Sequence, residues 1–208
     1  LDARVLIGVC GKPGVCKSTF TEYLANNLPR EIVCIVPMDG FHFSNKVLET
    51  RNLRELKGAP ATFDIHGFIN LLERIRNFPD QNIYYPVFDR AIEESISAQG
   101  VLSPQAKLII VEGNYLCHDR DGWDNILGFL DETWYLEIDD EARWRRLIDR
   151  HIQFGKSADI ARDWSLGTDE RTAQLIAQHA AQSDFRIELS LKWKRTLQNF
   201  GSFPINSP

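Results

Sequence analysis

The feature that most constrains this chain is the stretch GKPGVCKST, from Gly11 to Thr19. It directly follows the apolar run VLIGVC at residues 5–10, so the local order is a strand, a glycine loop and a helix that opens at Lys17. A loop with little side-chain bulk lets backbone N–H groups point at phosphate oxygens, and the positive end of the following helix favours the same anion. The stretch is typical of a phosphate-binding loop of Walker A type.

We expect the whole loop to contact a nucleotide, with Lys17 reaching the β and γ phosphates and the Ser18 hydroxyl ligating Mg²⁺. The expected contact residues are Gly11, Lys12, Pro13, Gly14, Val15, Cys16, Lys17, Ser18 and Thr19. The alternative is a glycine-containing turn between a strand and a helix, with no ligand.

One position departs from the motif, because Cys16 stands where a glycine normally precedes the lysine. A Cβ at this position either crowds the phosphates or places a residue other than glycine at positive φ. The sequence therefore predicts a loop with weakened nucleotide binding.

Composition limits the classes of protein that fit. At 208 residues, with 43% apolar and 25% charged residues, the chain is expected to form one soluble domain. A net charge of −5 argues against a nucleic-acid binder. We expect a cytoplasmic protein without membrane contact, because the sequence has no apolar run of about 18 residues and no signal-peptide pattern. The four cysteines lack metal-ligand spacing and are expected to be reduced thiols.

Apolar runs and helix-period stretches alternate along the chain, which predicts an α/β fold with a parallel sheet and helices on both faces. Strands are expected at 3–10, 31–37, 107–112, 133–138 and 185–189, and helices at 17–28, 66–77, 139–153 and 170–181. The polar segment from Met38 to Asp64 is long for a simple connection, which favours a functional role.

Two acids are expected at the carboxyl ends of strands, where open parallel sheets bind ligands. Asp39, in MDGFH, could accept the proton of an attacking hydroxyl or help to hold Mg²⁺; the alternative is a turn aspartate. Glu112 ends the apolar run IIVE and is predicted to support Mg²⁺ in the manner of a Walker B acid; the alternative is a surface acid that ends a strand.

Polar side chains placed near phenylalanines suggest a pocket for a polyhydroxylated or anionic small molecule. The polar set is His42, Lys57, Asp64, Asp89 and Arg90, and the apolar set is Phe41, Phe63 and Phe88. Taken one at a time, each polar residue is more often a surface residue.

Three arginines, Arg143, Arg146 and Arg150, share one face of the helix expected at 139–153. Over a nucleotide site this face would act as a lid that neutralises a transferring phosphoryl group. The alternative is a solvated charged face.

Together these motifs resemble the uridine kinase, phosphoribulokinase and bacterial pantothenate kinase superfamily. The segments PMDGFH, KGAPATFD, PVFDR, VEGNYL and RHIQFGKS are most similar to the bacterial group called fructose transport system kinases, or nucleoside/nucleotide kinase family proteins. The resemblance covers residues from about 5 to about 181.

The resemblance implies an ATP- and Mg²⁺-dependent phosphotransferase with the three-layer P-loop NTPase fold and a five-stranded parallel sheet. The kinase domain would span 1–208, with a substrate-binding insert at about 38–105 and a lid at about 140–170. The implied catalytic residues are Lys17, Asp39, Arg146 and Arg150; the metal-binding residues are Ser18, Asp39 and Glu112; the acceptor-binding residues are Asp39, His42, Lys57, Phe63, Asp89, Arg90, Glu112 and Tyr115.

The acceptor itself stays open at this point. A sugar such as fructose, a nucleoside and a pantothenate-like molecule are alternatives, and so is a regulatory nucleotide-binding protein in which Cys16 impairs transfer. The partner is expected to be a small molecule, and the sequence leaves open whether the chain forms a homodimer.

Overall fold

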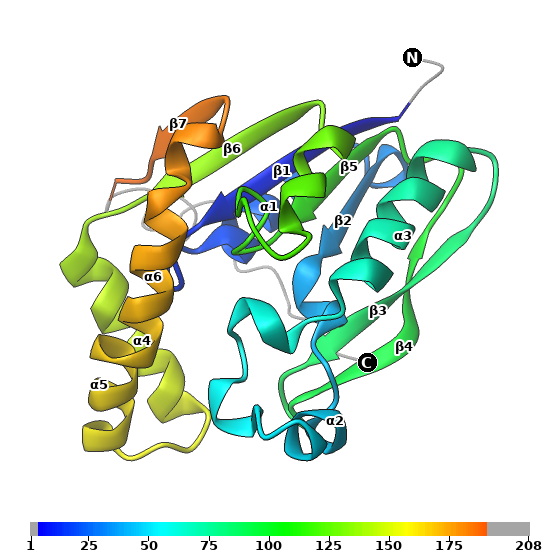
Figure 1. Cartoon of the computed structure of the whole chain (residues 1–208). Helices are drawn as coiled ribbons and strands as arrows, with labels where there is room; N and C mark the ends of the chain where they lie inside the picture. Colours follow the sequence, from blue (N-terminus) through cyan, green and yellow to red (C-terminus); the bar gives the residue numbers. More distant parts are fainter. Residues whose placement is uncertain (1–3, 191–208) are drawn as a thin grey trace.

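The computed structural model describes residues 4–190 and is built around a parallel sheet of five strands in the order β2-β5-β1-β6-β7 (Figure 1). These strands are β1 Val5–Gly11, β2 Val33–Pro37, β5 Leu108–Glu112, β6 Glu132–Glu137 and β7 Phe185–Glu188. The glycine loop leaves the central strand β1, which pairs in parallel with β5 on one side and β6 on the other. The strands expected from apolar runs are confirmed to within a few residues at their ends.

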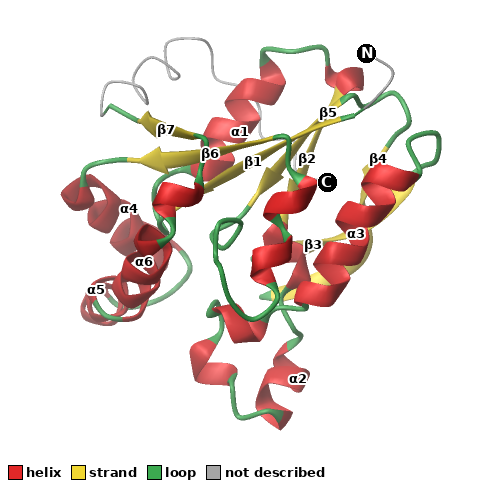
Figure 2. Cartoon of the chain, turned by 45° about the horizontal axis from the view of Figure 1, so that its top comes forward, coloured by secondary structure: helices red, strands yellow, loops and turns green. Residues whose placement is uncertain are grey.

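Helices cover both faces of the sheet, as Figure 2 shows. They are α1 Lys17–Asn26, α2 Asn45–Thr50, α3 Ile65–Asn77, α4 Asp140–Gln153, α5 Ala158–Leu166 and α6 Thr168–Gln178. Alternate residues of β1 point to opposite faces, so Leu6 and Cys10 pack in one core with Phe68 of α3, whereas Val9 packs in the other with Phe20 of α1. The expected three-layer α/β architecture is confirmed.

An antiparallel hairpin, which the apolar pattern did not predict, lies beside the main sheet. It consists of β3 Ile83–Asp89 and β4 Glu94–Leu102, and its register shifts between Tyr85 and Val87. The irregularity surrounds Pro86, which has no N–H for the ladder. The turn between the strands carries Arg90 toward the carboxyl end of β2, where it meets Asp39.

The segment between β2 and α3 is not one open loop. It contains the short helix α2 and three 3₁₀ turns at Met38–Phe41, Arg54–Leu56 and Pro60–Thr62. The first of these turns holds Asp39 directly after β2. Helix α5 was also missed by the sequence analysis, inside the region expected to be a lid. No helix within residues 4–190 combines the length and apolarity that crossing a membrane requires.

Candidate active site

Two glycines of the loop have positive φ, with 149° at Gly11 and 81° at Gly14. A Cβ on Gly11 would lie 2.7 Å from the carbonyl oxygen of Leu136, and one on Gly14 would lie 2.7 Å from the Leu147 side chain of α4. Glycine is therefore favoured at both positions for two reasons: it adopts positive φ without strain, and it has no Cβ to clash with the neighbouring atoms.

The Lys17 ammonium lies back along the loop and donates to the carbonyl oxygens of Gly11 at 3.0 Å and Lys12 at 3.3 Å. The residue is only 9% exposed, and burial lowers the pKa of its ammonium, while the carboxylates of Glu112 and Asp39 oppose that shift. The ammonium is thus held by the loop carbonyls, close to two acids that the sequence analysis selected.

Of the two outcomes expected for a Cβ at position 16, the structure shows a strained backbone at Cys16. It precedes α1 in the left-handed region, with φ 70° and ψ 39°. A residue other than glycine in this region costs on the order of 1–2 kcal/mol.

Glu112 joins the end of β5 to the start of α1. Its carboxylate accepts hydrogen bonds from the Ser18 hydroxyl at 2.7 Å and from the Thr21 hydroxyl at 3.2 Å. Burial raises the pKa of the Glu112 carboxyl, with Lys17 and the Ser18 hydrogen bond acting in the opposite direction. A carboxylate and a hydroxyl in contact are hard oxygen donors, which fits Mg²⁺.

Asp39 and Arg90 form an ion pair, with Oδ2 of Asp39 3.1 Å from Nη2 of Arg90. The two residues come from the end of β2 and from the β3–β4 turn, 51 positions apart in the sequence. Gly40 permits this approach, because a Cβ at that position would lie 2.0 Å from the carbonyl oxygen of Pro86. The Asp-Gly pair is therefore explained by packing of the hairpin as well as by turn formation.

An open pocket of about 380 Å³ lies between the glycine-loop helix and the hairpin. Among its lining residues are Ser18, Asp39, Tyr85, Phe88, Arg90 and Glu112. The hairpin contributes aromatic side chains and Arg90, and the other side contributes hydroxyl and acidic groups, which is the combination expected for a small polar ligand.

A second pocket of about 330 Å³ lies on the other side of the loop, at the carboxyl ends of β6 and β7. It is lined by Lys12, Val15, Ile138, Asp140 and Glu188, among others. The loop therefore separates two open sites, one toward β2 and one toward β7.

His42 lies beneath the first pocket in an aromatic stack. Its ring centroid is 4.0 Å from that of Phe63 and 4.8 Å from that of Phe88, and its Nδ1 donates to the Asp39 carbonyl oxygen at 2.7 Å. Burial lowers the pKa of the imidazole, so the ring is neutral at neutral pH. His42 is thus placed to fix the backbone of Asp39.

The remaining expected acceptor residues are engaged within the fold. Lys57 donates to Asn45 and to the Glu93 carbonyl oxygen and lies 5.1 Å from the Phe88 ring centroid. Asp89 accepts from two backbone N–H groups of the β3–β4 turn. The buried Tyr115 donates to the Gly58 carbonyl oxygen at 2.6 Å. None of these three residues is among the residues that line the pocket.

The three arginines of α4 differ in their surroundings. Arg143 is fully buried; it donates to Asp140 at 2.8 Å and also bonds Glu170, so it ties α4 to α6. Arg146 has a buried Nη1 with no hydrogen-bond partner within residues 4–190. Burial and the nearby Arg90 lower the pKa of Arg150, which also interacts with Asp39.

Several residues of this region were not found by the sequence analysis, or were given no role. Thr21 is the second donor to Glu112, and Glu170 accepts from both Arg143 and the Trp144 indole. Lys12 and Arg143 both bond Asp140, which links the loop to α4. These partners lie up to 128 positions apart in the sequence, so only the three-dimensional structure shows that they are in contact.

Comparisons with known proteins identify the family to which the chain belongs. The model of the phosphoribulokinase / uridine kinase family matches residues 6–188. The Escherichia coli (strain K12) protein YggC is 31% identical over 90% of this chain and 78% of its own length. A proposed uridine kinase of Schizosaccharomyces pombe, C227.14, is 35% identical over 74% of this chain and 69% of its own length.

Among solved structures, a proposed fructose transport system kinase from Silicibacter sp. TM1040 superposes with a TM-score of 0.81 at 34% identity. The match covers 90% of this chain and 91% of that one. The chain therefore belongs to the phosphoribulokinase / uridine kinase family and has the P-loop kinase fold.

Proposed function

We propose that the protein transfers the γ-phosphoryl group of ATP to a hydroxyl group of a small polyhydroxylated metabolite, with a sugar as the first candidate. The observation that carries the proposal is the ion pair of Asp39 and Arg90 at the wall of a pocket that also contains Ser18 and Glu112. The Asp39 carboxylate and the Arg90 guanidinium thus line the same pocket as Ser18 and Glu112, whose oxygen atoms suit Mg²⁺.

In this mechanism Asp39 accepts the proton of the acceptor hydroxyl as its oxygen attacks the γ phosphorus and ADP leaves. Arg90 contacts Oδ2, which leaves Oδ1 as the oxygen that can receive the proton. His42 holds the Asp39 backbone through its 2.7 Å hydrogen bond, and so orients the carboxylate.

The charges around the loop fit a polyphosphate. Lys17, Arg90 and Arg150 gather near Asp39, and the proximity of Arg90 lowers the pKa of Arg150. Cations held close together are stabilised by a bound anion. Ser18 and Glu112 would hold Mg²⁺, which when bound neutralises phosphate charge.

In this proposal the acceptor and the nucleoside part of ATP bind in different pockets. The pocket toward β2 contains Asp39 and suits the acceptor, and the pocket beyond Lys12, toward β7, suits the nucleoside part of ATP. The sugar assignment is supported by the likeness to the Silicibacter protein. A nucleoside is the competing acceptor, favoured by the Tyr85 and Phe88 side chains in the pocket wall.

Purified protein with ATP, Mg²⁺ and a panel of sugars, nucleosides and pantothenate tests the proposal by ADP release. We expect release to be stimulated by one acceptor class, with sugars first. Stimulation by a nucleoside would reassign the acceptor, and no stimulation across the panel would refute the transferase.

A second candidate is a nucleotide-binding regulatory protein with impaired transfer, and the strained Cys16 favours it. Such a protein would bind ATP without acceptor-stimulated turnover. Cys16→Gly would then increase ATP affinity and create turnover that the natural chain lacks.

A further inference from the structure

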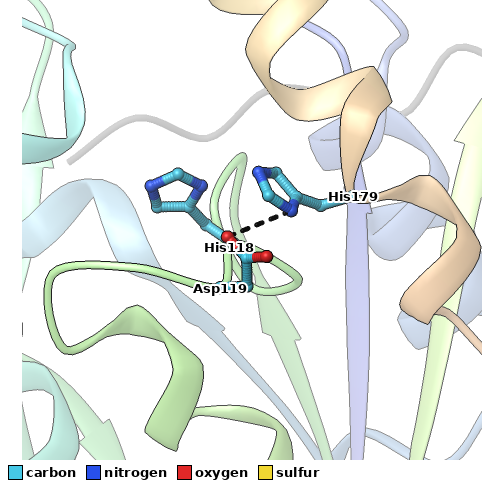
Figure 3. A group of neighbouring side chains, drawn as sticks. All are labelled: His118, Asp119 and His179. Carbon is cyan, nitrogen blue, oxygen red and sulfur yellow. Dashed lines mark ion pairs between the residues drawn. The ribbon is translucent and has the colours of Figure 1, made fainter.

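Two histidines and an aspartate meet on the α6 side of the sheet. His118 and Asp119 follow β5 in the loop that begins at Gly113, and His179 stands at the end of α6 (Figure 3). One ring nitrogen of each histidine and one carboxylate oxygen of Asp119 all lie within 4.8 Å of one another. None of the three residues belongs to the candidate active site.

The two imidazoles are buried, with exposed fractions of 5% for His118 and 8% for His179. Their ring centroids are 4.8 Å apart, and Nδ1 of His179 lies 3.5 Å from Oδ1 of Asp119. Nδ1 of His118 is buried and has no hydrogen-bond partner within residues 4–190. A buried polar atom without a partner is costly, so this nitrogen calls for a ligand.

A neutral imidazole with a free lone pair is the form that binds a metal ion. Asp119 is 44% exposed in its side chain and gives the cluster an open side toward solvent.

We propose that His118, Asp119 and His179 bind a divalent transition-metal ion, with Zn²⁺ as the expected occupant. Two imidazole nitrogens and one carboxylate suit zinc, whereas magnesium and calcium prefer oxygen donors alone. A fourth position remains for water on the exposed side.

The geometry requires only a small contraction. Ligand atoms about 2.0–2.1 Å from a tetrahedral ion are separated by roughly 3.4 Å. The His179–Asp119 distance of 3.5 Å already meets this value. The other two separations, which are at most 4.8 Å, have to shorten on metal binding. The half-exposed Asp119 side chain can move toward the histidines, because only a surface pair with Arg120 at 3.6 Å holds it on its other side.

A metal ion at this position would join the loop after β5 to the end of α6. The same loop contains Tyr115, and the opposite end of α6 contains Glu170, which bonds Arg143 of α4. The ion would therefore stabilise the packing of α6 against the sheet. Through the bond between Glu170 and Arg143, it would also stabilise the position of α4, which carries the three arginines. This inference does not depend on the proposed transferase activity.

The test uses the full chain after chelator treatment, without nucleotide. Zn²⁺ is titrated by calorimetry and by thermal unfolding, and Co²⁺ by its visible spectrum. We expect one Zn²⁺ per chain, a higher Tm, and a cobalt spectrum without a thiolate charge-transfer band. Mg²⁺ at the same concentration should leave Tm unchanged in the absence of nucleotide.

The variants His179→Gln and Asp119→Asn should each raise the Kd for Zn²⁺ by roughly tenfold or more. The matched controls His66→Gln and Asp124→Asn, at exposed positions, should not change it. Asp119→Asn keeps the test decisive if the buried histidine variant fails to fold, because Asp119 is partly exposed. Absence of Zn²⁺ binding, unchanged binding in Asp119→Asn, or a thiolate band would each overturn the proposal.

Discussion

Nη2 of Arg90 lies 3.1 Å from Oδ2 of Asp39 and joins the turn of the β3–β4 hairpin to the carboxyl end of β2. The hairpin forms one wall of the pocket that we propose for the acceptor. Arg90 is 47% exposed and Asp39 31% exposed in their side chains, so the pair adds little to stability. The pair places a cation and a carboxylate at the wall of the same pocket.

Replacement of Arg90 by glutamine should therefore affect catalysis more than folding. We expect a higher KM for the acceptor, while the free energy of unfolding changes by less than about 1 kcal/mol. Steady-state kinetics and denaturant unfolding measure the two effects. Arg120→Gln, in another exposed pair, is the control and should leave KM unchanged. Equal KM values for Arg90→Gln and the natural protein would remove Arg90 from the acceptor site.

Replacement of the loop cysteine should improve the protein rather than impair it. Cys16→Gly should stabilise the protein by up to about 1–2 kcal/mol, because glycine adopts φ 70° without strain. Part of this gain is offset by the greater freedom of glycine in the unfolded chain. The same variant should bind ATP more tightly. Calorimetry of ATP binding together with thermal unfolding tests both effects, and a loss of stability would show that the cysteine is well accommodated.

The α4 arginines should separate into a structural and a functional residue. Arg143→Ala removes one partner of a buried pair and should destabilise the fold by roughly 3–5 kcal/mol. Arg150→Gln should instead lower kcat, with a much smaller change in the free energy of unfolding. Urea denaturation and kinetics of both variants test the division. Similar losses of stability for the two would contradict it.

Glu112 gives a pH-dependent prediction for the protein without ligands. Burial raises the pKa of its carboxyl above the ordinary value of 4.5, so its favourable contribution is present below that value and is lost as pH rises through the folded-state pKa. The stability of the natural protein relative to Glu112→Gln should therefore fall as the pH rises above 4.5. Tm measured for both proteins as the pH is raised tests this. A difference that is constant with pH would refute the raised pKa.

The sequence predicted those parts of the fold and site that are determined locally. Apolar runs such as Leu108–Glu112 could be read as buried strands, and the glycines and lysine of the loop specified its conformation. The β3–β4 hairpin was missed because Pro86 interrupts one strand and only two of the nine residues of the other are buried. Its polar residues give no clear alternation.

The roles of individual side chains were harder to predict, because they depend on partners distant in the sequence. Arg143 and Arg150 share a helix face, yet Arg143 is buried against Glu170 of α6. Asp39 and Arg90 were both selected, but their direct contact follows from packing of Gly40 against Pro86. Spacing along one helix could not reveal either outcome.

The central claim, that Asp39 accepts the proton of the phosphoryl acceptor, is tested most directly by Asp39→Asn. The substitution keeps the size of the side chain and removes its charge. With the acceptor found in the panel, kcat should fall by roughly 10²-fold or more, while the Kd for ATP changes little. Turnover equal to that of the natural protein would contradict the account.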